Sequence, residues 1–166
     1  MTPEELAIAQ STPNHRFDKP LYVPPKRSED VAPTPEAETL VSTALSDRDR
    51  PVVLFALEWC EFCWAVRKLF ARCGIRYRAI DIDSVAYQRD QLGERIRSVL
   101  QARTGSSTIP QVFVGGSRIG GADDTFAAFQ AGRLQELLCA HGVAFEDTLG
   151  DALYSLMPGW AQKRPK

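Results

Sequence analysis

A continuous apolar run followed by a helical pattern most constrains how this chain can fold. Residues 52–57 are VVLFAL, a run rich in strand formers and suited to a strand covered on both faces. Apolar side chains then recur at helical spacing from Phe62 to Cys73, and Gly74 follows as a C-terminal cap. Residues 77–82 predict a second strand. Together these segments predict a βαβ unit with two parallel strands and a right-handed crossover.

Turn and helix signals on both sides extend this unit to an α/β domain. Gly115-Gly116, between two short runs of strand formers, is the strongest hairpin signal in the chain. After the second run, Asp123 or Asp124 is expected to cap a helix. The further predicted elements are a helix from near Glu36 to before Pro51, a helix from Leu92 to before Gly105, strands over 111–114 and 117–119, a helix with Phe126 and Phe129, and a last short helix after Gly132.

Proline usage divides the chain into a domain and two extensions. Seven of the eleven prolines fall within residues 1–35, among charged and small polar residues, so this segment is expected to be mostly disordered or extended. Its apolar patch over 17–23 is a candidate for docking on the domain or on a partner. The α/β domain is expected over 36–142 and a C-terminal extension over 143–166. A short amphipathic helix, packing on its own domain or docking a partner, is predicted there from Leu149, Leu153, Leu156 and Met157.

Charge, hydropathy and cysteine content exclude several classes of function. The net charge of −1 argues against a nucleic-acid-binding surface, which would carry a basic patch. No apolar run approaches the roughly 20 residues that a membrane span needs. The N-terminus has neither a basic start nor an apolar segment, so a cytoplasmic protein is expected. Four cysteines are too few for a disulfide scaffold, and in the cytosol they are expected to be reduced.

A C-x-x-C motif lies where the first predicted strand passes into its helix. Cys60 would lie at the helix N-terminus, where free backbone N–H groups and the helix dipole favour a thiolate. Cys63, one turn later, would be close enough to resolve a mixed disulfide formed at Cys60. This pattern predicts a dithiol redox site, with Cys60 as the nucleophile and Cys63 as the resolving cysteine.

The same pair of cysteines could be half of a zinc site, which would need two further ligands. Cys73 lies on the predicted buried helix face, and Cys139 with His141 is not a usual ligand pairing. His15 is the last candidate ligand. Cys73 and Cys139 are both expected to be core residues, and no metal site is predicted.

Across residues 51–142 the chain resembles the glutaredoxin family, because three motifs occur in the family's order. These are the C-x-x-C, Thr108-Ile109-Pro110, and Gly120-Gly121-Ala122-Asp123-Asp124. The resemblance implies an α/β thioredoxin fold, with a four-stranded mixed sheet flanked by helices. It also implies that Pro110 follows a cis peptide bond and faces the redox cysteines.

The resemblance further implies a glutathione site. Ile109 would bind the cysteinyl part of glutathione through its backbone, and Asp124, with the backbone of Asp123, would bind the γ-glutamyl ammonium. Arg97 would reach the glycyl carboxylate, unless it is a solvated helix residue. Trp59, which flanks the C-x-x-C motif, is expected either to form an apolar rim for a protein substrate or to be a half-buried packing residue. The expected glutathione-binding residues are Trp59, Arg97, Thr108, Ile109, Pro110, Gly121, Asp123 and Asp124.

Three positions near the first cysteine depart from the family pattern. Leu57 replaces a common lysine, Glu61-Phe62 replaces a common Pro-Tyr, and Ser107 stands where the family often has a basic residue. Each change removes positive charge or adds negative charge near the sulfur, and a carboxylate beside Cys60 should disfavour the thiolate. A slower or more specialised member of the family is therefore expected.

As implied by the resemblance, the chain would reduce protein disulfides or protein–glutathione mixed disulfides, with glutathione as the electron donor. Two alternatives remain open at this point. One is a carrier of a [2Fe–2S] cluster, a glutathione-bridged dimer in which Cys60 is the ligand. The other is a redox adaptor without catalysis, which contacts partners through its extensions. A reductase partner could also replace glutathione as the donor, because Leu57 and Glu61 change the site.

Overall fold

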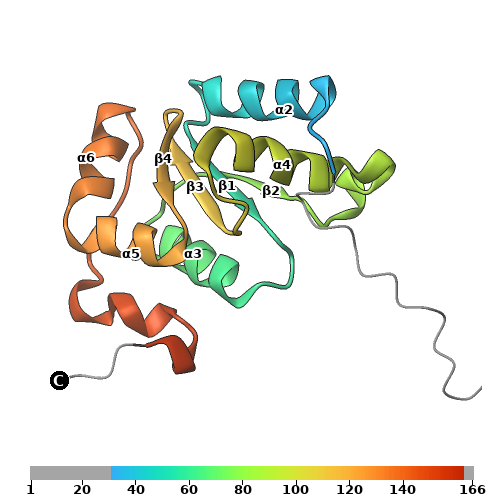
Figure 1. The fold of residues 1–166 in the computed structure, drawn as a ribbon. Helices are drawn as coiled ribbons and strands as arrows, with labels where there is room; N and C mark the ends of the chain where they lie inside the picture. The colour runs from blue at the N-terminus through green and yellow to red at the C-terminus, as the bar shows by residue number, and fades with distance from the viewer. Residues whose placement is uncertain (1–30, 163–166) are drawn as a thin grey trace, which may run out of the picture.

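The computed structural model describes residues 31–162. It contains one four-stranded sheet in the order β2-β1-β3-β4 (Figure 1). Strands β1 (Val52–Ala56) and β2 (Arg78–Asp81) are parallel, whereas β3 (Gln111–Val114) is antiparallel to β1 and to β4 (Ser117–Gly120). The mixed sheet flanked by helices is the thioredoxin fold that the sequence predicts, and the βαβ unit and the hairpin are confirmed.

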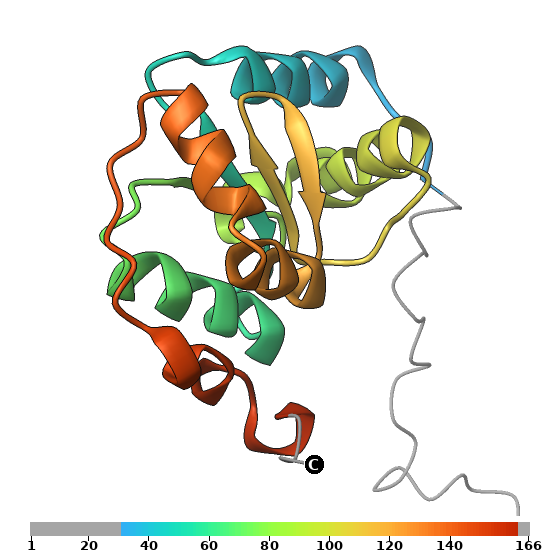
Figure 2. The ribbon, with the colours of Figure 1, turned by 90° about the vertical axis from the view of Figure 1, so that its left-hand side faces the viewer.

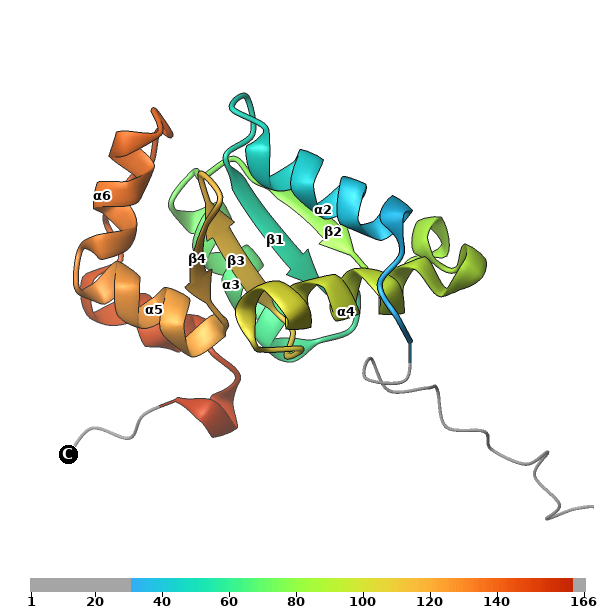
Figure 3. The same ribbon diagram turned by 45° about the horizontal axis from the view of Figure 1, so that its top comes forward.

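Helices cover both faces of the sheet, which explains why every side chain of β1 is buried. Val53 and Phe55 point toward α2 (Pro35–Ser46) and α4 (Leu92–Thr104), which lie together on one face (Figure 3). The alternate residues of β1 pack with α3 (Glu61–Arg72) and α5 (Ala122–Gln130) on the other face. This two-residue alternation divides the core into two layers.

The chain continues after α5 into α6 (Arg133–Ala140) and then runs back to α3. The predicted amphipathic C-terminal helix is a 3-10 helix, η4 (Gly150–Leu156), followed by the short η5 (Gly159–Ala161). Leu153, Leu156 and Met157 are buried in the layer that contains α3 and α5. The segment therefore packs on its own domain, beside α3 (Figure 2).

Two details of the helix ends and cysteines differ from the sequence-based predictions. Gly121, and not Asp123 or Asp124, is the N-cap of α5, because the chain turns into the helix two residues before Asp123, and Asp124 is the N3 residue. Cys73 is buried as expected, but Cys139 is exposed, because it lies on the outer side of α6. Only Leu134 and Leu138 are buried on this helix.

The first described residues contact α4. Val31 is buried, its carbonyl accepts a hydrogen bond from the Ser98 hydroxyl, and the Ala32 carbonyl accepts one from Arg95 Nη1 at 2.9 Å. Most of the predicted N-terminal extension, including the apolar patch over 17–23, lies outside the described residues. Among residues 31–162, no helix is long and apolar enough to cross a bilayer.

Candidate active site

The two cysteines of the C-x-x-C motif lie at the start of α3 and differ in exposure. Cys60 is the N-cap residue, with extended backbone angles, and its carbonyl accepts the first helical hydrogen bond from Trp64 at 3.0 Å. Its side chain is partly exposed, whereas Cys63 is fully buried one turn later. Both thiols are free. The helix therefore presents Cys60 to an incoming substrate and places Cys63 beneath it.

Electrostatics reinforces this difference. Burial, together with the neighbouring Cys60 side chain, raises the pKa of Cys63 to about 12. The backbone N–H of Leu57 donates to Cys63 Sγ at 3.5 Å, which opposes the shift without reversing it. Cys63 is therefore a neutral thiol near pH 7 and a poor nucleophile, whereas Cys60 is the accessible one.

Two hydrogen bonds of the Glu58 backbone hold the loop before Cys60. The N–H of Glu58 donates to Asp83 Oδ1 at 2.9 Å, and its carbonyl accepts from Trp64 Nε1 at 2.7 Å. Arg67 lies over the Trp64 ring, 5.2 Å from its centroid, and forms an ion pair with Asp81 at the end of β2. These contacts connect the loop to β2 and α3, so the position of Cys60 depends on both elements.

A polar pocket of about 210 Å³ lies on one side of the C-x-x-C motif. The peptide bond between Ile109 and Pro110 is cis, as the resemblance implies. This bond and the N-terminus of α5 bring two segments far apart in the sequence to one site. The lining residues are Phe62, Thr108, Ile109, Pro110, Gly121, Ala122, Asp123 and Asp124.

Asp124 is held at the α5 end of this pocket. Its Oδ2 accepts a hydrogen bond from the N–H of Gly121 at 3.1 Å, as the N3 residue of a capping box. Gly120 has a φ of +130°, and a Cβ there would collide with the Asp124 carboxylate. The glycine therefore allows Asp124 to fold back over the helix start, where its negative charge can attract a ligand ammonium group.

A second concave surface lies on the other side of the motif, and we call it the tryptophan groove. It has a volume of about 410 Å³ and combines the start of α3 with the C-terminal segment. Trp160 Nε1 donates to Glu61 Oε2 at 2.9 Å, and the Trp160 ring meets the Phe62 ring edge-on at 5.3 Å. The groove is lined by Trp59, Glu61, Trp64, Lys68, Leu156, Pro158, Gly159 and Trp160.

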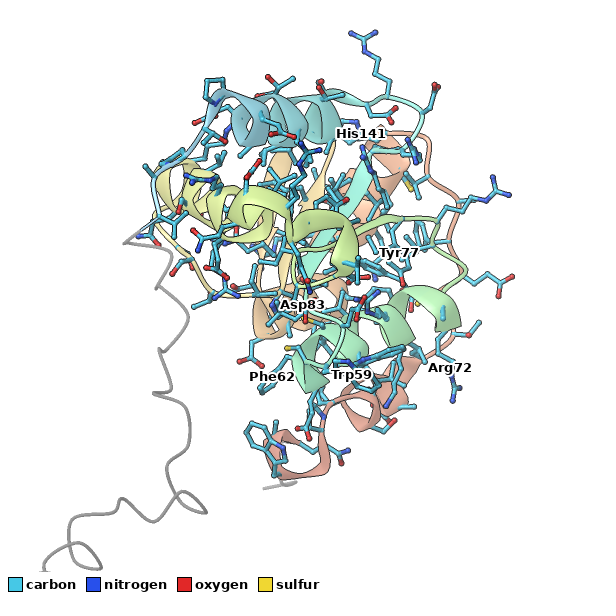
Figure 4. All side chains as sticks on the ribbon, turned by 90° about the vertical axis from the view of Figure 1, so that its right-hand side faces the viewer. Trp59, Phe62, Arg72, Tyr77, Asp83 and His141 are labelled. Carbon is cyan, nitrogen blue, oxygen red and sulfur yellow. The ribbon has the colours of Figure 1, made fainter. Side chains whose placement is uncertain are left out.

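The structure brings most of the predicted glutathione residues together. Six of the eight line the polar pocket: Thr108, Ile109, Pro110, Gly121, Asp123 and Asp124. Trp59 lies instead in the tryptophan groove, and in Figure 4 it lies with Phe62 at the end of the molecule opposite His141. Arg97 is half-buried on α4 and is not among the lining residues of either site.

Sequence reasoning missed three residues of this region. Phe62 lines the polar pocket, Asp83 positions the loop before Cys60, and Trp160 closes the tryptophan groove. Phe62 could have been identified from the sequence, because it lies inside the C-x-x-C motif. The other two act through contacts 25 and 99 residues apart in the sequence, which no local pattern indicates.

The described residues contain no group of three or more His, Cys, Asp or Glu side chains that could hold a metal ion. A [2Fe–2S] cluster takes four protein or substitute ligands, and of the two cysteines in the motif only Cys60 is partly exposed. Residues 31–162 of one chain thus do not supply four ligands at this site. The glutathione-bridged dimer stays a prediction.

The sequence is similar to that of known glutaredoxins. The glutaredoxin family model matches residues 52–119, from the start of β1 into β4. Rice Glutaredoxin-C6 is 39% identical over 92 residues, which are 55% of this chain and 78% of that protein. The chain belongs to the glutaredoxin family. Rice Monothiol glutaredoxin-S10 is 38% identical over 90 residues, 54% of this chain, but the match spans only 52% of that protein.

A solved structure of a buckwheat glutaredoxin–glutathione complex is similar to this glutaredoxin in fold. It is 32% identical, with a TM-score of 0.57, and the superposition covers 68% of this chain and 99% of that one. Membership of the family supports a thiol–disulfide oxidoreductase role. The matched segment ends before the C-terminal segment, so the residues of η4 and η5 that line the tryptophan groove lie outside it.

The structure shows the surroundings of the three positions that depart from the family pattern. Leu57 is half-buried and packs with the core layer of α2 and α4. A lysine at this position would have to extend its ammonium group to solvent. The Glu61 carboxylate turns to the Trp160 indole. Ser107 is half-buried beside the polar pocket and brings no charge to it.

Proposed function

We propose that this glutaredoxin reduces protein–glutathione mixed disulfides with glutathione as the electron donor. The observation that carries the proposal is the position of Cys60, partly exposed at the start of α3 and between two concave surfaces. The polar pocket supports glutathione as the donor because Asp124 offers a carboxylate for its ammonium group. The likeness to a glutaredoxin that is complexed with glutathione supports the same ligand.

The reaction follows from the two cysteines. The Cys60 thiolate attacks the glutathione sulfur of the mixed disulfide, a Cys60–glutathione disulfide forms, and the protein thiolate leaves and takes a proton from solvent. The thiolate of a second glutathione then attacks the same glutathione sulfur, which releases glutathione disulfide and restores the Cys60 thiolate. The net reaction converts the mixed disulfide and one free glutathione into the protein thiol and glutathione disulfide.

The dithiol route is the slower one in this site. When Cys60 attacks a protein disulfide, Cys63 has to lose a proton before it can attack the sulfur of Cys60 in the mixed disulfide. Because burial raises the pKa of Cys63, that thiolate is scarce near pH 7. We therefore expect monothiol turnover through glutathione to dominate, in the reducing conditions expected of a cytoplasmic protein.

The test compares wild type, Cys60→Ser and Cys63→Ser in the glutathione-coupled reduction of the mixed disulfide of glutathione and 2-mercaptoethanol. Cys60→Ser should lose at least about a thousandfold in rate, because the nucleophile is gone, while Cys63→Ser keeps most of it. Cys139→Ser is the control, since that thiol is exposed on α6, away from the motif. An inactive wild type would refute the proposal and leave the adaptor and the cluster carrier.

A further inference from the structure

All three tryptophans of the chain line the tryptophan groove, and all three are exposed. Trp59 is 90% exposed, Trp64 48% and Trp160 73%. Among the described residues, Val85 is the one other large apolar side chain with comparable exposure. Exposed apolar side chains gathered in one concave patch are typical of interaction sites, and tryptophan contributes strongly to binding there. The three exposed rings therefore mark this groove as a candidate interaction site.

The wall formed by Trp160 is held in place before any ligand binds. Its indole is hydrogen-bonded to Glu61, and its ring contacts Phe62. The preceding Met157 is buried in the core, and its carbonyl accepts a hydrogen bond from Gln162 Nε2 at 3.0 Å. A wall that is already ordered loses little conformational entropy on binding.

The groove and the polar pocket flank the same four residues, 60–63. Glu61 lines the groove, whereas Phe62 lines the pocket. A protein–glutathione mixed disulfide has two halves, which meet at the S–S bond that Cys60 attacks. With the glutathione half in the polar pocket, the groove is the concave surface left beside Cys60 for the other half.

The chemistry of the groove selects an apolar occupant. Its two charged side chains, Glu61 and Lys68, have opposite signs, and the Glu61 carboxylate already accepts a hydrogen bond from Trp160. Leu156 and Pro158 complete the apolar surface between the indole rings. The volume of about 410 Å³ is within the range of pockets that bind compact organic groups.

We propose that the tryptophan groove binds the polypeptide half of the substrate, an extended segment with an aromatic or large aliphatic side chain beside its reactive cysteine. This inference rests on the proposed function, because the segment is one half of that reaction's substrate. The C-terminal segment thereby becomes a specificity element, which supplies one wall of the site through Trp160.

The test uses the full-length protein and two glutathionylated peptides, identical except for phenylalanine or glycine next to the cysteine. Wild type should reduce the phenylalanine peptide with a kcat/KM about tenfold higher, the effect of one well-packed aromatic contact. Trp160→Ala should reduce that preference to about twofold or less, and Trp160→Phe, which keeps a ring against Phe62, should retain part of it. Val85→Ala is the matched control, an exposed apolar residue outside the groove, and should keep the full preference.

A measurement without turnover separates the two proposals. A peptide with serine in place of cysteine should quench tryptophan fluorescence when it contains phenylalanine, and less so in Trp160→Ala. Equal kcat/KM for both peptides in wild type, with normal reduction of the 2-mercaptoethanol mixed disulfide, would overturn the groove proposal alone. Failure on that small disulfide would overturn the proposed function, while the fluorescence still reports on the groove.

Two other occupants would also overturn the proposal. A wild-type dimer that dissociates in Trp160→Ala, seen by sedimentation, would assign the groove to a second copy. An increase in affinity for the phenylalanine peptide after Tyr22→Ser would assign it to the N-terminal segment of the chain.

Discussion

The polar pocket and the tryptophan groove lie on either side of Cys60 but are built differently. The polar pocket combines the Ile109–Pro110 bond with the start of α5, and its charged residues are Asp123 and Asp124. The groove is aromatic and takes one wall from η5, at the end of the described chain. One redox residue thus lies between a polar surface formed by family motifs and an apolar surface formed jointly by α3, the loop before it and the C-terminal segment.

The largest effect is expected from a substitution at Gly120, which acts on the polar pocket and not on the tryptophan groove. Gly120→Ala combines an unfavourable φ with a collision against the Asp124 carboxylate, so it should lower the free energy of unfolding by about 2–4 kcal/mol. It should also raise the KM for glutathione, because Asp124 is displaced from the pocket. Urea denaturation and steady-state kinetics measure the two effects.

Gly132→Ala is the matched control for this substitution. Gly132 also has a positive φ, +81°, but nothing lies within 4 Å of the added Cβ. It should cost about 1 kcal/mol through backbone strain and leave the KM for glutathione unchanged. Equal effects of the two glycine substitutions would show that the contact with Asp124 has no role in the pocket.

The next largest effect tests the charge of the polar pocket. Asp124→Ala should raise the KM for glutathione about tenfold to a hundredfold, the effect of losing a hydrogen bond to a charged group. It should also cost about 1 kcal/mol of stability through the lost cap. Asp124→Asn should keep most of the stability, because its oxygen can still accept from Gly121, and yet lose the affinity.

Glu136→Ala controls for a general effect of removing a carboxylate, since Glu136 lies in the first turn of α6. Binding of the phenylalanine peptide to the tryptophan groove should stay unchanged in all these variants. Parallel losses on both surfaces would mean that the pocket and the groove are not independent.

A third prediction concerns Cys63, which lies beneath both surfaces. Its pKa is raised to about 12 by burial, against about 8.5 for an unfolded thiol. At pH values between these two, the folded state keeps a proton on Cys63 that the unfolded state has lost. The resulting stability is complete below about pH 8.5 and is lost as the pH rises toward 12. Reduced wild type should lose unfolding free energy over this window, by up to about 1 kcal/mol per pH unit, and Cys63→Ser should lose less.

Urea denaturation under reducing conditions at several pH values measures this slope. Cys139→Ser should follow the wild type, because its thiol is exposed on α6. Superimposable curves for wild type and Cys63→Ser would contradict the raised pKa and, with it, the preference for monothiol turnover.

The smallest effect is expected at the loop that both surfaces share. Asp83→Ala removes the acceptor of the Glu58 N–H and should lower kcat/KM a few-fold, by the same factor for the phenylalanine and glycine peptides, because it displaces Cys60 itself. Asp49→Ala, an exposed aspartate far from the motif, should change neither. A selective loss on one peptide would place Asp83 in recognition and not in positioning.

Much of the fold and half of the site could be predicted from local patterns. The helix of Phe62 to Cys73 has its apolar face in phase with the core, and Gly74 and Gly105, with positive φ, end two helices as expected. The predicted N-cap of α5 was wrong, because the chain enters the helix at Gly121, two residues before Asp123. The predicted burial of Cys139 was wrong, because the buried face of α6 carries Leu134 and Leu138 and Cys139 lies off that face.

The sequence by itself determined the βαβ unit, the hairpin and the dithiol motif, because periodicity, turn glycines and short motifs are local properties. The resemblance to a known family added six residues of the polar pocket. Only the tertiary structure decided that Trp160 would contact Glu61, that Asp83 would hold Glu58, and that Trp59 would line the tryptophan groove and not the polar pocket. These contacts depend on how α3, β2 and the C-terminal segment pack against one another. Long-range packing buries apolar surface cooperatively over the whole domain, so no short stretch of sequence encodes it.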